Sequence, residues 1–424
     1  MNLPFIYGPT NYIVCKYMSA PTVAKHSGLQ VHVPAHQNGV FNKHIPKTSY
    51  IPVRAGTTND AWTTSGSYLD FLIPASVGVL SDVSLRFDIN NTGAALLCPP
   101  TPYWVQQIEV YIGTHQIEVL YPNDIQNETV GFKSNDELAA VATVINNNSV
   151  DYAVGANVPV GTNSFYLPFN NCLTEARLYV HGVEEDVYFR IYFPANMFPN
   201  TFKLQSATLV ITEDVGSSAD RGRHKHGHDK GIIYNTVVRQ RQSIPYAKPD
   251  GTAPTTLELT GLYGNSAGLV VYAGPSVVPG TGTSTNPFDR AGAAVATNTL
   301  LNKRFPLKTL ELNDQMGKKI TEELKGPALK AFTWWTHVGT QYAANPYVNT
   351  YLIPFCSNFR ATLEDGNNHG YMPMDNTNRL VINAAFADVV AANPLSETWV
   401  ITITNYVYQQ LVFQNGKLVN IIKK

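Results

Sequence analysis

The chain has 424 residues, of which 44% are hydrophobic and 14% are charged, and its formal net charge is −1 at pH 7. This length is enough for two or three domains, and the apolar content excludes a disordered chain. The near-neutral charge argues against a dedicated nucleic-acid binder, which normally carries a basic surface. Because an ordinary soluble domain has roughly 25% charged residues, the low charge indicates that subunit contacts cover much of the surface.

Cysteine usage and the N-terminus bear on the cellular compartment. The N-terminus shows no positively charged region before a long apolar core, so we expect no secretory signal. No apolar run reaches the roughly 18 residues of a membrane span. The cysteines are scattered and form no CxxC pair, which predicts neither a disulfide framework nor a zinc site and fits a reducing compartment. They are Cys15, Cys98, Cys172 and Cys356.

Residues 1–48 are punctuated by Pro, His and Gly and show little periodicity. We interpret them as an arm, partly extended, that docks on another molecule. The spacing of the histidines in this arm matches no metal-ligand pattern. These histidines are His26, His32, His36 and His44.

Residues 49–216 carry the period-two alternation of half-buried strands, for example over 83–89. Residues 104–121 predict a hairpin around a Gly-Thr turn. A long polar excursion follows at 122–163. It holds one helical candidate, residues 136–145, which is preceded by Ser134 with Glu137 three residues on, a capping box.

Residues 217–231 interrupt the pattern with the sequence SSADRGRHKHGHDK and are predicted to be a linker. The pattern then restarts over residues 232–424, where helical turns could form at 321–336. Strands are predicted at 232–244, 255–262, 269–272 and 399–408. Near the end of the chain, Asn415 and Gly416 stand between two apolar strands, which is a strong signal for a two-residue hairpin turn.

One β-unit occurs twice in the chain. Residues 165–193 and 351–386 both begin with a strand that ends in Pro-Phe, continue through a polar connection, and close with an alternating apolar strand. About eight strands are expected in each half, joined by long loops with little helix. We therefore predict an all-β fold of two tandem eight-stranded jelly rolls, the first over residues 49–216 and the second over 232–424.

Two patterns could carry hydrolytic chemistry. Residues 264–268 match the G-x-S-x-G motif with Ser266 as nucleophile, but a strand ending at proline follows where the motif needs a helix. We interpret this stretch as a turn between antiparallel strands. Glu184, Glu185 and Asp186 could supply the carboxylate pair of a glycosidase, although a solvated turn explains them better.

His224, His226 and His228 form the sequence HKHGH in the predicted linker. On an extended strand alternate residues face the same way, so three imidazoles could converge on Zn²⁺ or Ni²⁺. The neighbouring Arg and Lys residues equally describe a solvated or anion-facing linker, so the metal site is kept only as an alternative. We expect no catalytic residues and no cofactor.

Several aromatic residues of the second half could stack sugars or bases. Packing in the core and between subunits is the favoured interpretation, because aromatic residues dominate both. The residues concerned are Trp334, Trp335, Tyr342, Tyr347 and Tyr351.

Five segments together resemble the double-jelly-roll major capsid proteins of tailless membrane-containing phages, virophages and large DNA viruses. In the first half, YLDFLIPASVGVLSDVSLRFDI resembles the entry strands of that family, and IEVYIGTHQIEVLYPNDI resembles its φ-E-φ-x-I-G-G-x-x-I-D hairpin (φ apolar), with Thr114 where a second Gly is usual. Residues 165–193 resemble the family's I-P-L-φ-F-W-F segment and the strand after it, with Asn170 and Asn171 in place of the aromatic pair. In the second half, TLELNDQMGKKI and residues 349–386 resemble the corresponding strand, turn and Pro-Phe region. Met372-Pro373-Met374-Asp375 replaces the usual Pro-Ser-Gly.

The resemblance implies a structural protein and not an enzyme. It implies a homotrimer whose six rolls form a pseudo-hexagonal capsomer of an icosahedral virion, assembled in the host cytoplasm or a virus factory. Implied partners are neighbouring capsomers, penton and minor or cement proteins, and an inner membrane or its proteins reached by the N-terminal arm. No sequence-specific nucleic acid is implied.

Two other classes of protein remain open from the sequence. A two-domain β-sandwich glycosidase or esterase would need Ser266 or an acidic pair such as Glu185 and its neighbours in a cleft. A carbohydrate-binding or adhesin module would favour a secretion signal and exposed rows of aromatic residues.

Overall fold

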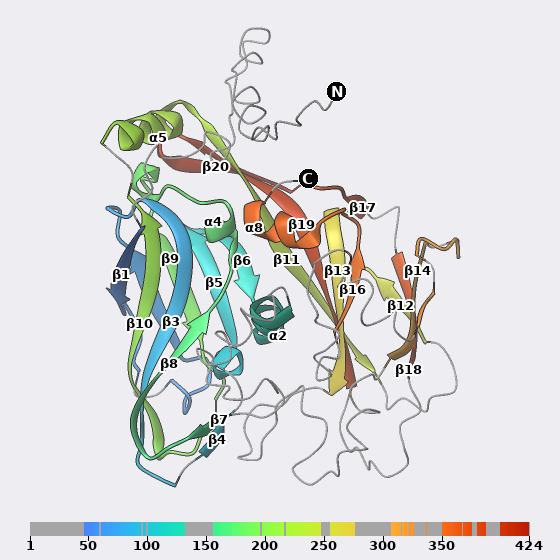
Figure 1. The fold of residues 1–424 in the computed structure, drawn as a ribbon, viewed down its shortest axis with the longest axis horizontal. Coiled ribbons are helices and arrows are strands. Elements are labelled where there is room, and N and C mark those ends of the chain that lie inside the picture. Colours follow the sequence, from blue (N-terminus) through green and yellow to red (C-terminus); the bar gives the residue numbers. More distant parts are fainter. Residues whose placement is uncertain are drawn as a thin grey trace, which may run out of the picture.

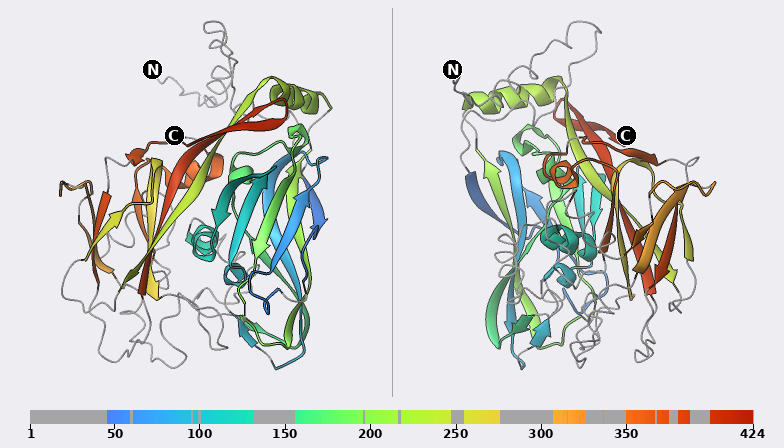
Figure 2. Two further views of the ribbon diagram at one scale, coloured as in Figure 1. Left: turned by 180° about the vertical axis from the view of Figure 1, so that it is seen from behind. Right: turned by 45° about the vertical axis from the view of Figure 1, so that its right-hand side comes forward.

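A computed structural model shows two β-sandwiches that lie side by side, connected at one end by long strands (Figures 1 and 2). The structure describes residues 46–58, 61–94, 96–98, 101–131, 156–195, 197–215, 218–246, 255–275, 307–314, 316–321, 323–325, 336, 350–366, 368–374, 380–386 and 399–423.

The first sandwich consists of two four-stranded antiparallel sheets. One sheet has the order β1-β10-β3-β8 and the other β2-β9-β5-β6. The first sheet contains β1 (Pro46–Pro52), β10 (Phe202–Asp214), β3 (Val79–Asn91) and β8 (Gly161–Pro168). The second contains β2 (Tyr68–Ile73), β9 (Val187–Tyr192), β5 (Gln107–Ile112) and β6 (His115–Leu120). A short separate ladder joins β4 (Leu96–Cys98) to β7 (Ala156–Val158).

The second sandwich repeats this order strand for strand. Its sheets run β11-β19-β13-β16 and β12-β18-β14-β15, so the eight strands take the same places in the same chain order in both sandwiches. The first sheet contains β11 (Ile232–Tyr246), β19 (Trp399–Gln414), β13 (Gly264–Pro275) and β16 (Thr350–Pro354). The second contains β12 (Thr255–Leu259), β18 (Leu380–Phe386), β14 (Leu307–Asp314) and β15 (Leu324–Lys325). The predicted pair of jelly rolls is confirmed.

Two further strands extend the β11-β19-β13-β16 sheet. Strand β17 (Met372–Met374) pairs with β13, and β20 (Lys417–Lys423) pairs with β19. The turn between β19 and β20 is the predicted two-residue hairpin. Asn415 and Gly416 have φ of 51° and 71°, the left-handed values that a tight type I′ turn requires. The predicted hairpin at Gly113 and Thr114 is likewise present between β5 and β6.

The alternating strands bury one face, as their sequence predicts. In β3 the side chains of Val83, Leu85, Phe87 and Ile89 are buried, while those between them are half-buried or exposed. Each fully buried side chain of this size contributes roughly 1.5–3 kcal/mol. Trp62 completes this core and packs edge-on against several rings at the centre of the first roll. Its ring centroid lies 4.9 Å from that of Phe198, 5.8 Å from Phe193 and 6.0 Å from Trp104.

The repeated β-unit has the same structure in both rolls. In the first roll, β8 leads through α4 (Cys172–Glu175) to β9, and in the second, β16 leads through α8 (Phe359–Asp365) to β18. An asparagine caps each helix. Asn171 accepts hydrogen bonds from Leu173 N and Thr174 N, and Asn358 accepts one from Ala361 N.

Replacing the buried Asn171 with alanine should lower the free energy of unfolding by about 1 kcal/mol, because two helical N–H groups lose their acceptor. The half-buried neighbour Asn170 is the matched control, and Asn170→Ala should change stability by less than about 0.5 kcal/mol. Urea denaturation measures both. Equal losses for the two variants would show that the cap is not what Asn171 contributes.

Residues 218–230 of the predicted linker form a helix, and not the extended strand on which the alternative of a three-histidine metal site depended. Helix α5 (Ser218–Lys230) is followed by Gly231, whose φ of 120° takes the chain out of the helix and whose N–H donates to Gly227 O. His228 and Lys230 lie in the last turn, where the helix dipole favours positive charge. The segment has no apolar periodicity that would predict a helix, because solvent surrounds most of its described side chains.

The long strands β11 and β19 belong to both rolls. Tyr234, Leu411 and Phe413, at their α5 ends, are buried in the same hydrophobic cluster as the core of the first roll. A separate cluster, which includes Leu310, Ile403 and other buried residues, fills the second roll. The core of the first roll therefore extends onto the α5 ends of β11 and β19, while the second roll keeps a core of its own.

Three predictions lie wholly or mainly outside the described residues: the arm at 1–48, apart from 46–48 in β1, the helix at 136–145, and the helical turns at 321–336.

Candidate functional site: the junction between the two rolls

The outer face of the β11-β19-β13-β16 sheet is covered by the first roll. Side chains that point away from the second roll's own core would be exposed in an isolated sandwich, yet Val270, Leu352 and Thr404 are 1%, 0% and 2% exposed. Short elements of the first roll lie over them, among them α2, which stands between the rolls in Figure 1. These elements are η2 (Thr101–Trp104), α2 (Pro122–Gln126) and η3 (Asn127–Gly131).

Hydrogen bonds between side chains join the rolls across this junction. Thr404 Oγ1 donates to Asp124 Oδ1 at 2.6 Å. Thr350 Oγ1 donates to Asn127 Oδ1 at 3.1 Å. All four side chains are buried, so each bond satisfies groups that water cannot reach.

A buried arginine lies at the centre of the junction. The guanidinium of Arg239, on β11, donates to Glu128 through Nε and Nη2 at 2.7 and 2.8 Å, and through Nη1 to Glu118 of β6 at 2.7 Å. Nη2 also donates to Glu175 of α4. The four side chains are at most 3% exposed. The Tyr406 hydroxyl donates to Glu128 at 3.1 Å and completes the arrangement. We call Arg239, Glu118, Glu128 and Glu175 the junction cluster.

The junction cluster contains three carboxyl groups and one guanidinium. Burial raises the pKa of Glu175 to about 8, and it raises the pKa of Glu128 as well, while Arg239 opposes both shifts. Burial also raises the pKa of Asp124, which Arg241 partly opposes from a position 4.4 Å over the Tyr121 ring. One cation cannot neutralise three anions, and the raised pKa of Glu175 keeps that carboxyl protonated near neutral pH.

A second contact ties the β19–β20 hairpin to the first roll. Glu184 N donates to Gly416 O, and Leu418 N donates to Glu185 Oε2, both at 2.7 Å. Gly416 N donates to His228 O at 3.2 Å. The Glu185 carboxylate and the backbone of Glu184 thus contact the second roll's hairpin, so the predicted solvated turn is also a contact between the rolls.

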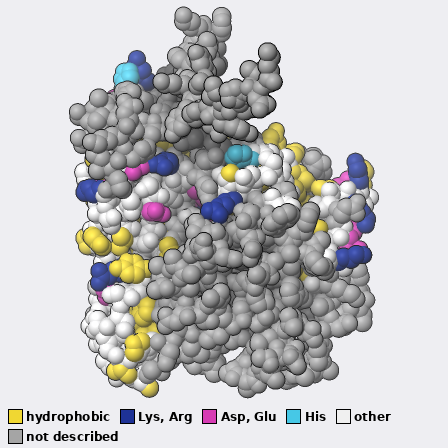
Figure 3. Space-filling view, viewed as in Figure 1, with side chains coloured by type: hydrophobic (Ala, Val, Ile, Leu, Met, Phe, Trp, Pro, Cys, Tyr) yellow, Lys and Arg dark blue, Asp and Glu magenta, His cyan; other side chains and the backbone are white. Residues whose placement is uncertain are grey.

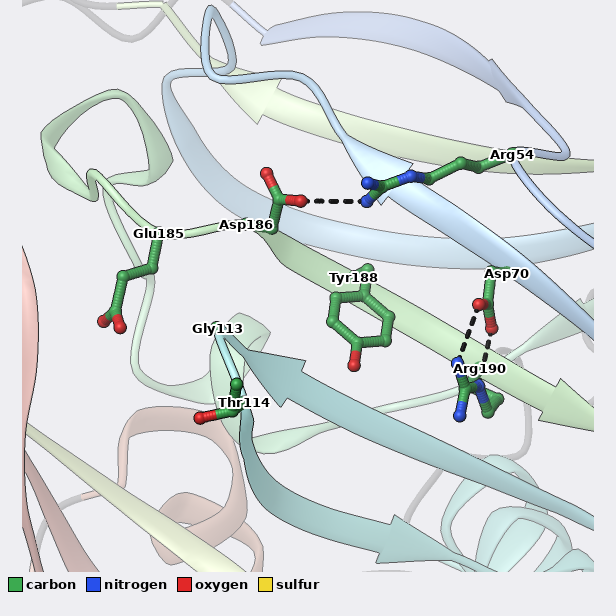
Figure 4. Close-up of a pocket in the computed structure, with 8 residues that line it drawn as sticks. All are labelled: Arg54, Asp70, Gly113, Thr114, Glu185, Asp186, Tyr188 and Arg190. Carbon is green, nitrogen blue, oxygen red and sulfur yellow. Dashed lines mark hydrogen bonds and ion pairs between the residues drawn. The ribbon is translucent and has the colours of Figure 1, made fainter.

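Asp186 belongs to an open pocket of about 530 Å³ on the first roll, shown in Figure 4. Four of its charged groups form two ion pairs. Asp186 accepts from Arg54 at 2.9 Å, and Asp70 accepts from Arg190 at 2.8 and 2.9 Å. Glu185 points away from Asp186 in Figure 4, so the two carboxylates do not face a common substrate position as a glycosidase pair would.

Ser266 is a buried residue near the start of β13, not a turn residue as predicted. Its Oγ donates to Gly268 O at 3.3 Å, and the pairing with β19 shifts register between these two residues. The glycines of the motif therefore accommodate a β-bulge. A buried serine that donates to the backbone within its own strand lacks the exposed position of a nucleophile elbow.

The three histidines of the HKHGH segment lie on helix α5, so the strand geometry expected to bring them together is wrong. His228 is buried, and its Nε2 lies 2.6 Å from the Tyr234 hydroxyl, whereas His226 is exposed. The side chain of His224 is not among those described. Within the described residues, no three His, Cys, Asp or Glu side chains gather in a way that could hold a metal ion.

The remaining sequence candidates are core residues or lie outside the described part. Tyr351 is fully buried in the second roll, and the thiols of Cys172 and Cys356 are buried. Trp334, Trp335, Tyr342 and Tyr347 lie outside the described residues.

No protein-family model matches the sequence, and no curated protein is similar to it. Several solved structures match this chain, and each alignment covers most of both chains. The PBCV-1 virus capsid protein aligns with a TM-score of 0.64 and 13% identity, covering 90% of this chain and 98% of that one. The Faustovirus major capsid protein gives 0.62 and 8% identity, covering 92% and 94%. A chain of the Sputnik virophage gives 0.53 and 8%, covering 100% and 93%. These likenesses show the double-jelly-roll fold.

Proposed function

We propose that this chain is a viral major capsid protein that forms a pseudo-hexagonal homotrimer and tiles an icosahedral shell. The proposal rests on the strand order, which is the same in the two rolls. Buried hydrogen bonds at the junction hold these two rolls together in one chain. Three such chains place six similar rolls around a threefold axis, which gives a capsomer with hexagonal outline. The structural likeness to the PBCV-1 and Faustovirus capsid proteins supports the same function.

In this function the protein has a structural role and not a catalytic one. The junction cluster fixes the two rolls relative to each other, so that one chain fills two nearly equivalent corners of the hexagon. The sequence motifs that could have supported an esterase or glycosidase are a buried strand residue and a set of carboxylates held by other groups. No observation favours those activities or a carbohydrate-binding role.

The partners that follow from this function are other virion components. They are neighbouring capsomers, penton proteins, minor or cement proteins, and an inner membrane or its proteins, which residues 1–48 would reach. The protein would lie in the virion after assembly in the host cytoplasm or a virus factory. In the described part of the chain, none of the helices has the length and apolar character of a membrane span.

Light scattering of the purified full chain tests the proposal. At micromolar concentration we expect a particle of three chains, each of 46.6 kDa, that resists heating because large interfaces stabilise it. A stable monomer under these conditions would contradict the proposed function.

A further inference from the structure

A buried histidine anchors helix α5, the segment that connects the two rolls. Figure 1 shows α5 at one end of the molecule, beside β20. In the part of the helix whose side chains the structure describes, Lys225, His226, Asp229 and Lys230 are exposed, and Figure 3 shows the surface at this end with some of its basic side chains. His228, in the last turn, is 0% exposed. The helix is therefore held against the protein through this imidazole.

The imidazole of His228 fills a space between the two rolls. Its ring centroid lies 5.3 Å from that of Phe413 on β19 and 5.5 Å from that of Tyr234 on β11. On the first roll it packs against η4 (Val180–Gly182). Gly182 leaves room for the ring, because a Cβ at this position would lie 2.5 Å from the imidazole Cδ2. The histidine thus joins a turn of the first roll to the long strands of the second.

The backbone of the same helical turn contacts the β19–β20 hairpin. Gly416 N donates to His228 O at 3.2 Å, and Asn415 N donates to Asp229 O at 3.4 Å. Carbonyl groups in the last turn of a helix have no acceptor role within the helix, so the hairpin supplies their donors. One turn of α5 therefore holds the first roll through a side chain and the hairpin through its backbone.

The hydrogen bonds at the imidazole fit its neutral form. Tyr179 N donates to Tyr234 Oη at 3.4 Å, which leaves the hydroxyl proton of Tyr234 to donate to His228 Nε2 at 2.6 Å. Burial raises the pKa of Tyr234, so the phenol keeps this proton. An imidazole nitrogen that accepts a hydrogen bond carries no proton. Protonation would turn Nε2 into a donor and displace the hydroxyl proton from its acceptor.

The groups around the imidazole compensate little for a buried positive charge. The phenols of Tyr179 and Tyr234 face it and are neutral in acid. The helix C-terminus and the aromatic rings favour a cation, but two of the last carbonyl groups are already bonded to the hairpin. Water screens the ionisable side chains on the surrounding elements, which are exposed or half-buried. They are His181, Glu184, Glu185, Lys417, Asp229 and Lys230.

We infer that His228 is an acid-sensitive latch, whose protonation releases the last turn of α5 from η4 and from the β19–β20 hairpin. An exposed histidine titrates near pH 6.5, so the closed form binds fewer protons than the open form below that pH. The stability of the closed form is therefore complete above about pH 6.5 and falls on acidification. The junction cluster responds in the opposite direction, because Glu175 binds a proton as the pH falls. Acid loosens this end of the molecule while the rolls stay joined, whether or not the chain forms a capsid.

Amide hydrogen exchange of the full-length protein, followed by mass spectrometry, tests the latch. After correction for the intrinsic effect of pH on exchange, protection in peptides covering 225–231 and 413–417 should fall by roughly tenfold or more between pH 7 and pH 5, because opening takes up a proton. Peptides covering 236–241, at the junction, should keep their protection. Constant protection at 225–231, or an equal loss at 225–231 and 236–241, contradicts the inference.

Two pairs of variants identify the group responsible. His228→Gln keeps an acceptor for Tyr234 but does not titrate, so its protection should be the same at pH 7 and pH 5. The exposed His226 provides the matched control, and His226→Gln should lose protection in acid as wild type does. Gly182→Ala should open the latch at pH 7, because its methyl group takes the space of the imidazole, whereas Gly222→Ala meets nothing within 4 Å and should not. A His228→Gln variant that loses protection in acid like wild type would show that the imidazole is not the cause.

Deuterium exchange at the imidazole Cε1–H of each histidine gives a result that needs no substitution. Measured against pH in the wild-type protein, it reports where each ring takes up its proton. We expect His228 to become protonated at a lower pH than His226. This measurement decides the matter even if His228→Gln is unprotected at every pH. Protonation of His228 together with His226 contradicts the inference and leaves the proposed function untouched.

Discussion

Replacing Arg239 with methionine is expected to destabilise the protein by about 3–5 kcal/mol, because removing one partner of a buried ion pair leaves uncompensated charge. Glu118, Glu128 and Glu175 would lose their only cation within hydrogen-bonding distance among the described residues. Methionine keeps much of the side-chain volume, so the loss reports charge more than packing. Urea denaturation at neutral pH measures the change in the free energy of unfolding.

Two further variants show whether charge is the cause. Arg54 forms an ion pair with Asp186 whose side chains are 49% and 57% exposed, so Arg54→Met should cost less than about 1 kcal/mol. Adding Glu118→Gln, Glu128→Gln and Glu175→Gln to Arg239→Met removes the charges together and should recover most of the lost stability. An Arg239→Met variant as stable as Arg54→Met would refute the role of the junction cluster.

Raising the pH is expected to weaken the junction. The pKa of Glu175 in the folded protein is about 8, above its ordinary value of 4.5, so between these values the folded state binds more protons than the unfolded state. Stability from this group is therefore complete below about pH 4.5 and is lost as the pH rises through 8. At 1.36 kcal/mol for each pKa unit, the loss is on the order of 5 kcal/mol. The raised pKa of Glu128 acts in the same direction.

Glu175→Gln isolates this contribution, since glutamine resembles the protonated carboxyl but does not titrate. The variant should lose less stability than wild type between pH 5 and 9, as followed by urea denaturation at each pH. Glu184→Gln, on an exposed side chain, is the matched control and should keep the wild-type profile. If the free energy of unfolding depends on pH in the same way for wild type and Glu175→Gln, the folded protein does not hold an extra proton at Glu175.

Local patterns predicted the architecture well. The repeated Pro-Phe unit located β8 with β9 and β16 with β18, and the glycines at 113 and 416 marked two hairpin turns correctly. These features depend on neighbouring residues: alternation sets which face is buried, and a left-handed turn needs glycine or asparagine. The double jelly roll follows because the same local signals recur in the same order.

The junction cluster was not predicted, because its chemistry is set by contacts far apart in sequence. Glu118 and Arg239 are 121 residues apart, and each occupies a strand position that alternation alone assigns to solvent. One signal was present: Arg239 lies in the middle of a long predicted strand, where a charged residue needs a partner if its face is covered. Helix α5 was missed for a related reason, since its exposed surface leaves no apolar pattern to recognise.

Electron microscopy of the purified protein in negative stain tests the central claim most directly. If two equivalent rolls are held rigidly in each chain and three chains close a ring, averaged images should show particles of hexagonal outline with six lobes and threefold symmetry. Isolated two-lobed particles, or rings with another number of lobes, would contradict the account.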